Sequence, residues 1–178
     1  VGRLLLNRLC VEEGKTPILA GAFRRAYGAQ ILRIRPFESF CYQCFLKMVP
    51  SAASEMEISN LEQADGIGYS DRLVPVEPGL SIDLVPCSHM AAKIVIQELL
   101  RDRETTFRHL DEDLSASWYL LLNRREPGTD YEHLEPLGCD IDGMRILRWY
   151  GVEVERDPEC PVCGGTEAVW AGMDRSVA

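Results

Sequence analysis

Two short cysteine motifs decide the fold: Cys-Tyr-Gln-Cys at residues 41–44 and Cys-Pro-Val-Cys-Gly at residues 160–164. Two residues between the cysteines of a motif let both sulfurs turn toward one point. The glycine after the second motif permits a tight turn in which backbone amides face the sulfurs. Because distant parts of the chain supply the two motifs, the sequence predicts one four-sulfur site made by Cys41, Cys44, Cys160 and Cys163.

Zinc is the metal that this pattern favours, and two alternatives remain at this point. A thioredoxin-like dithiol would explain one pair but not the other. A rubredoxin-like iron site uses the same four sulfurs, although the pairs lie close in sequence in such small proteins. Here 115 residues, 45–159, separate the motifs.

A zinc site with four cysteine ligands has no open coordination position, and zinc has no redox chemistry. The predicted site is therefore structural and clamps the C-terminal tail onto the segment after the second strand. Metal binding of this kind supplies apparent folding free energy on the order of 10 kcal/mol.

Composition narrows the classes of protein to which the chain can belong. It has 178 residues, seven cysteines and a formal net charge of −9. The acidic balance disfavours nucleic acid as the main partner, because phosphates are neutralised by clustered Lys and Arg. The sequence contains no run of about 18 apolar residues, the length that a membrane-spanning helix needs. No signal-peptide pattern is evident at its start. A secreted disulfide scaffold would be shorter, denser in cysteine and usually even in cysteine count, so we expect a reducing, cytoplasmic location and interpret close cysteine pairs as metal or redox sites.

The apolar pattern predicts an α/β fold with a partial mixed sheet. Helical spacing occurs at 4–10, with Gly14 past its end, and at 81–101, where apolar residues lie nearly all round and predict a buried helix against a sheet. Residues 51–77 indicate a long loop and residues 166–171 a short helix. Strands are predicted at 16–20, 30–35, 118–122 and 144–155.

Few other residues indicate chemistry. Cys10 lies in an apolar helix and is predicted to pack as a small hydrophobic residue. Cys87, two residues before His89, is either a nucleophile at a helix start or a packed cysteine, and packing is favoured. Cys139 has no recognisable partner. Neither a Gly-x-Gly-x-x-Gly pattern nor Gly-Lys-Ser/Thr follows an expected strand, so catalytic residues stay unassigned and no cofactor-binding residue is expected.

The order of motifs resembles the second half of the ThiF/MoeB/HesA family, the bacterial relatives of ubiquitin-activating enzymes. The resemblance rests on Leu-Leu-Asn at 5–7, Gly-Lys-Thr-Pro at 14–17, Cys-Tyr-Gln-Cys-Phe at 41–45 and Asp-Pro-Glu-Cys-Pro-Val-Cys-Gly at 157–164. It covers about residues 1–50, 78–102 and 144–165. In that family the two cysteine pairs bind a structural zinc.

The resemblance implies a Rossmann-like sheet and an adenylyltransferase that uses ATP and magnesium. Such enzymes activate the C-terminal glycine of a ubiquitin-fold carrier protein and usually act as homodimers. The carrier's tail would lie under a crossover loop at about 51–77. The family's ATP-binding half would precede Val1, so residues 1–178 would form one C-terminal domain that is inactive alone.

Two features of the sequence depart from the family's pattern. Residues 51–77 contain no cysteine, so no thioester role is carried over, and residues 103–142 have no counterpart and are expected to be a divergent insertion. The sequence shows no nucleotide-binding loop and no open metal position, and these absences motivate an alternative to an activating enzyme: a zinc-stapled binding module that scaffolds a protein partner without chemistry of its own.

Overall fold

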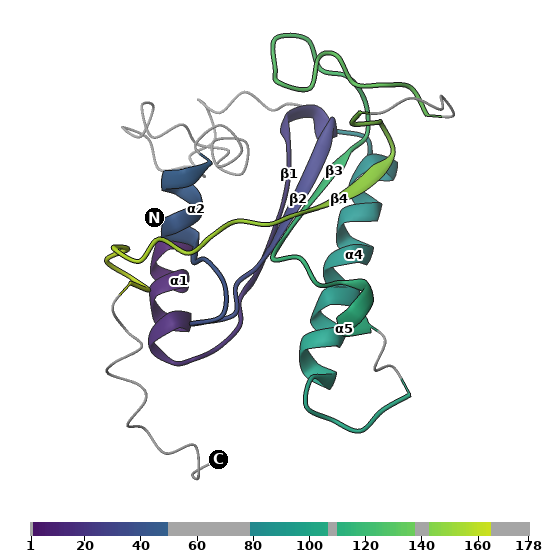
Figure 1. Ribbon diagram of the computed structural model, residues 1–178. Coiled ribbons are helices and arrows are strands. Elements are labelled where there is room, and N and C mark those ends of the chain that lie inside the picture. Colours follow the sequence, from purple (N-terminus) through teal and green to yellow (C-terminus); the bar gives the residue numbers. More distant parts are fainter. Residues whose placement is uncertain (1, 50–78, 107–109, 138–142, 165–178) are drawn as a thin grey trace.

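The computed structural model describes residues 2–49, 79–106, 110–137 and 143–164 (Figure 1). The expected crossover loop, the expected helix at 166–171 and Cys139 lie outside the described residues. The elements, in chain order, are α1 (Gly2–Glu12), β1 (Ile18–Ala22), a 3-10 turn (Arg24–Ala26), β2 (Gly28–Arg33), α2 (Tyr42–Met48), α4 (Ser81–Leu100), α5 (Leu110–Asp113), β3 (Trp118–Leu122) and β4 (Arg148–Val152).

The four strands form one sheet in the order β1-β2-β3-β4, and every neighbouring pair is antiparallel. The expectation of a mixed, Rossmann-like sheet is therefore not confirmed. The reason is local for the first pair, because β1 and β2 are joined by only a few residues. A parallel pair needs a crossover of a dozen or more residues.

Strand alternation sends β2 side chains to both faces of the sheet. Leu32 packs in one cluster with Tyr42, Phe45 and the four cysteines, whereas Ala29 and Ile31 pack in another with α4. All six residues of β2 are buried. Figure 1 shows α1 and α2 on one side of the sheet and α4 and α5 on the other. The sheet thus separates the cysteine cluster from the long helix.

Residues 103–142, expected as an insertion, supply a central part of the sheet. β3 lies in this segment and pairs with β2 on one side and β4 on the other. Its five residues are all buried. β3 is therefore part of the core of the sheet.

The long helix differs from the expectation of a buried helix. In α4 only Cys87, Ile94 and Gln97 are buried, while several large apolar side chains on the opposite face are exposed. Apolar residues occur around most of the helix, but the sheet covers just one face of it, and no other described element covers the rest.

A buried arginine joins α4 to the sheet. The Arg33 guanidinium donates to Gln97 Oε1 at 2.8 Å and to the carbonyl oxygens of Ser115 and Ala116, each at 2.8 Å. Glu98 accepts from Arg33 at 3.4 Å and from Arg35 at 2.6 Å. Glu98 of α4 therefore pairs with two arginines: Arg33 at the end of β2 and Arg35 two residues further on.

We expect Arg33→Met to lower the free energy of unfolding by about 3 kcal/mol. Methionine removes the hydrogen bonds that Arg33 donates in buried surroundings to Gln97 Oε1 and the carbonyl oxygen of Ala116, and the partly buried one to the carbonyl oxygen of Ser115. Arg103→Met, at an exposed position, should change it by about 0.5 kcal/mol or less. Chemical denaturation measures both. Equal effects of the two substitutions would contradict the buried network.

Candidate metal centre

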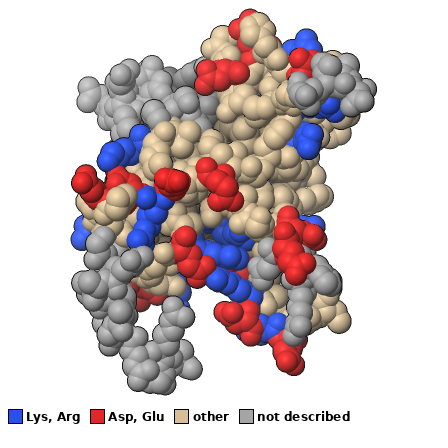
Figure 2. All heavy atoms as spheres, in the orientation of Figure 1, with Lys and Arg blue, Asp and Glu red and all other residues tan. Residues whose placement is uncertain are grey.

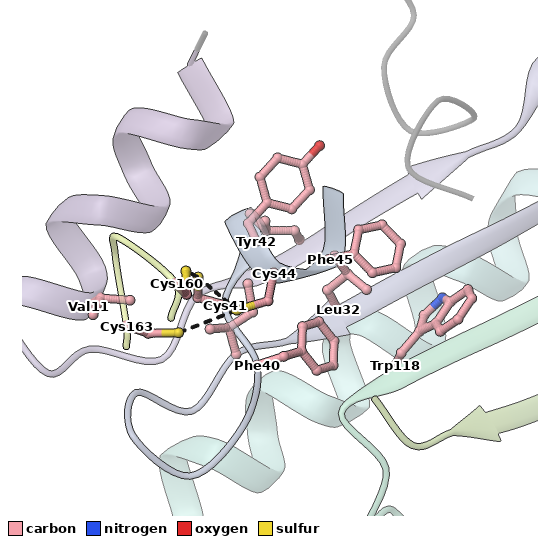
Figure 3. Close-up of a cluster of buried hydrophobic side chains, with 12 residues drawn as sticks. Val11, Leu32, Phe40, Cys41, Tyr42, Cys44, Phe45, Trp118, Cys160 and Cys163 are labelled. Carbon is pink, nitrogen blue, oxygen red and sulfur yellow. Dashed lines mark hydrogen bonds between the residues drawn. The ribbon is translucent and has the colours of Figure 1, made fainter. Parts of the chain in front are cut away.

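The four cysteines of the two motifs lie together and are buried (Figure 3). Sγ of Cys41 lies 3.8 Å from that of Cys44 and 3.6 Å from that of Cys160, and the sulfurs of Cys44 and Cys163 are 3.4 Å apart. All four sulfurs lie within 4.8 Å of one another. The structure thus brings together every ligand that the sequence predicts.

These separations fit a tetrahedral metal. Four sulfurs at the Zn–S distance of about 2.3 Å on a tetrahedron lie about 3.8 Å from each other. The measured separations of 3.4 to 3.8 Å fall close to this value. Four soft thiolate ligands also suit zinc or iron better than magnesium or calcium. The cluster could therefore hold one metal ion, for which it would supply a complete shell.

The start of α2 positions the first cysteine pair. Cys41 precedes the helix in an extended conformation, and its carbonyl oxygen accepts from the amide of Phe45 at 3.0 Å. Asn7 of α1 is buried, and its Oδ1 accepts from the amide of Tyr42 at 2.8 Å. Asn7 belongs to the Leu-Leu-Asn motif, but nothing in the sequence pattern indicates that its side chain holds the start of α2.

A tight turn positions the second pair. The amide of Gly164 donates to the carbonyl oxygen of Cys160 at 2.7 Å, and a side chain on Gly164 would collide with the backbone of Cys160 and Pro158. Lys47 of α2 reaches Asp157 at 2.7 Å, and this hydrogen bond lowers the pKa of the Asp157 carboxyl. The first motif's helix therefore also contacts the approach to the second motif.

Aromatic side chains separate the cysteines from the sheet. The rings of Phe40 and Phe45 stack with centroids 6.0 Å apart, and Phe45 meets Trp118 of β3 edge-on at 5.2 Å. Figure 3 shows these rings between the sulfurs and the strands. The cluster is thus shielded on this side by apolar groups, which strengthens the preference of a bound cation for charged sulfur ligands.

The thiols differ in acidity before a metal binds. Burial raises the pKa of Cys41 to about 11, and burial together with a hydrogen bond to Cys44 raises the pKa of Cys163 further. Burial also opposes the ionisation of Cys160, but backbone N–H groups of Cys163 and Val162 outweigh it and lower the pKa of that thiol to about 7. Cys160 is therefore more acidic than Cys41 and Cys163 in the metal-free protein.

The remaining described cysteines show no sign of activation. Cys87 is buried against the sheet, and burial raises the pKa of its thiol, as it does for the half-buried Cys10. His89 is exposed on the outer face of α4, whereas Cys87 faces inward. Packing, the interpretation favoured from the sequence, therefore fits Cys87 better than a nucleophilic role.

The comparisons with known proteins concern the fold. No protein-family model matches the sequence, and no curated protein matches it. Among solved structures, the chain is similar to a heterocyclase in complex with substrate and cofactor, with TM-score 0.52 and 15% identity over 96% of this chain and 20% of that one. It is also similar to the heterocyclase TruD, with TM-score 0.50 and 14% identity over 94% of this chain and 21% of TruD. MccB of E. coli matches with TM-score 0.44 and 15% identity over 92% of this chain and 35% of MccB.

These neighbours correct the sequence-based resemblance. The two similar structures with TM-scores of 0.50 and 0.52 are heterocyclases and not ThiF/MoeB/HesA activating enzymes, so the expected family is wrong. Adenylation of a ubiquitin-fold carrier rested on that resemblance and falls with it. At 14–15% identity the similarity shows a shared fold, and the chain spans about a fifth of the length of the two heterocyclases.

The surface carries charges of both signs. On the face drawn in Figure 2, acidic and basic side chains are interspersed and do not gather into separate areas. Among the described helices, none combines the length and apolar character that a membrane crossing needs.

We expect Cys160→Ser to lower metal content well below one ion per chain. Loss of one sulfur ligand should also lower the melting temperature by about 10 °C, corresponding to about 3 kcal/mol. Elemental analysis and calorimetry measure the two effects. Cys10→Ser, a half-buried cysteine outside the cluster, is the matched control and should keep its metal. Unchanged metal content in Cys160→Ser would refute the four-sulfur assignment.

Metal affinity should rise steeply with pH. Cys41, with a pKa of about 11, and Cys163, whose pKa is also raised, are protonated at pH 7 in the metal-free protein. A metal binds thiolates, so at least these two protons leave and the apparent association constant rises about 100-fold per pH unit between about pH 6 and 8. Competition with a chromophoric chelator measures the slope. A change below about tenfold per unit would contradict it.

Proposed function

We propose that these residues form a zinc-stapled scaffold module of a heterocyclase-like protein. In this proposal the module organises a binding surface and contributes no reacting group to ring formation. The observation that carries it is the closed cluster of four buried cysteines. The similarity of fold to two heterocyclases supports the choice of enzyme class.

The coordination chemistry argues for a structural role. When all four positions of a zinc ion are held by thiolates, no position is left for water or substrate, and the ion cannot act as a Lewis acid. The cysteine cluster is the only group of at least three candidate metal ligands within the part of the chain that the structure describes. The zinc would therefore hold residues 153–164 against α2 and supply folding energy.

Chemistry would then come from other parts of the enzyme. The heterocyclases that the chain resembles are about five times its length, so the module corresponds to a minor part of each. No phosphate-binding loop follows a strand in the sequence. We therefore assign ATP and magnesium to no residue of this chain and propose them only as cofactors of the larger protein.

Cobalt substitution separates a closed site from an open one. We expect the visible spectrum of the Co²⁺-substituted protein to remain unchanged when azide or imidazole is added, because no coordination position is free. A spectral shift with saturable binding would indicate an open, catalytic metal and overturn the scaffold role.

Cadmium substitution tests the same proposal through activity. In a heterocyclase that carries the module, replacing zinc by cadmium keeps the thiolate shell, so kcat for ring formation should change by about twofold or less. Loss of kcat with unchanged melting temperature would show that the metal takes part in the reaction.

A further inference from the structure

The outer face of α4 forms an apolar stripe that no described element covers. Its large side chains are among the most exposed of the chain: Ile82 is 74% exposed, Leu99 67%, Ile96 50% and Val85 45%. His89 and Ala92 lie between them and are also exposed. We call this surface the outer stripe of α4, defined by Ile82, Val85, His89, Ala92, Ile96 and Leu99.

The spacing of the outer stripe is that of a coiled-coil seam. Successive members are three, four, three, four and three residues apart, which is the a/d pattern of a heptad repeat. The stripe extends over about 25 Å of helix. A surface helix of a monomer normally shows one apolar stripe, whereas α4 uses a different face, with Cys87 and Ile94, to contact the sheet.

The stripe is complementary to itself. Two α4 helices can be packed antiparallel so that Ile82 of one copy faces Leu99 of the other. In this register the numbers of any two facing residues add up to 181, and Val85 therefore faces Ile96. His89, the bulky polar member, then faces the small Ala92. Each pairing occurs twice, which is the requirement for a two-fold interface in which both copies use the same surface.

The charged residues of α4 are compatible with this antiparallel pairing. Each chain has a formal net charge of −9, so acidic groups at a contact between copies would repel. Asp83 and Glu98 lie outside the stripe on partly buried positions of α4, and Glu98 faces Arg33 and Arg35. Lys93 is exposed and lies beside the stripe.

We propose that the outer stripe of α4 packs antiparallel against the same stripe of a second copy of this chain. The assembly has two sheets outside and two helices between them. A strip about 25 Å long and about 10 Å wide has a footprint on the order of 250 Å², well below the roughly 800 Å² that each partner buries in a stable complex. The dimer formed by this contact is therefore weak and reversible.

Sedimentation equilibrium on the metal-loaded protein tests the interface. We expect concentration-dependent dimerisation of the wild type, and Ile96→Glu should raise the Kd at least tenfold because it places a carboxylate opposite Val85. Leu9→Glu, an equally exposed leucine of α1 (48% against 50%), should leave the Kd unchanged. A wild type that remains monomeric at a few hundred micromolar, or a larger effect of Leu9→Glu, would overturn the proposal.

Charges introduced on both sides of the seam test the register without placing a charged residue inside the apolar contact. In the antiparallel register Ser88 flanks the seam next to Val95 of the other copy. Ser88→Glu with Val95→Lys should therefore lower the Kd, whereas Ser88→Glu with Val95→Glu should raise it. Both double variants should retain one metal per chain and the helical circular dichroism of the wild type. Equal dissociation constants for the two variants would exclude this register.

Discussion

The convergence of four cysteine sulfurs is the constraint that holds residues 153–164 against α2 and one face of the sheet. Cys41 and Cys160 are 119 positions apart, and closing a flexible chain of that length costs roughly 4 kcal/mol by the logarithmic loop-closure rule. A structural zinc site supplies on the order of 10 kcal/mol, which is enough to offset that cost. Val154 and Val162 then pack on the cluster that contains Leu32 and Phe45, so the returning chain completes the apolar cover of one sheet face.

A zinc ion held by these four thiolates would place net negative charge in apolar surroundings. Nearby backbone N–H groups stabilise that charge. Four thiolates around a divalent zinc carry a net charge of about −2, which burial disfavours. The backbone N–H of Cys44 bonds to the sulfur of Cys41, and those of Val162 and Cys163 bond to the sulfur of Cys160. These donors exist because each motif has only two residues between its cysteines. The spacing that aims the sulfurs therefore also supplies their hydrogen bonds.

The sequence predicts the parts of the fold that depend on local pattern. The cysteine spacing identifies all four residues that the structure groups, and Gly14, with φ of 61°, lies just past α1 as expected. The pattern fails where burial depends on a distant partner. Their polarity alone would favour solvent for Gln30 and Arg33, yet both are buried because Trp118 donates to Gln30 and Gln97 of α4 accepts from Arg33. The direction of each strand is likewise set only when the sheet assembles. The same holds for how much of α4 is covered, so neither property can be predicted from a single segment.

The buried polar contacts of α4 also determine which apolar side chains the helix exposes. An apolar helix on an apolar sheet can rotate about its axis with little change in buried area, because hydrophobic contact has no direction. Hydrogen bonds do have direction, and Gln97 bonds to both Arg33 and the carbonyl oxygen of Leu114. Glu98 faces Arg33 and Arg35 on the same side. Rotation by one residue, about 100°, would break all of these contacts. The orientation of the outer stripe of α4 therefore follows from Arg33, one of the most deeply buried side chains on the opposite side of the helix.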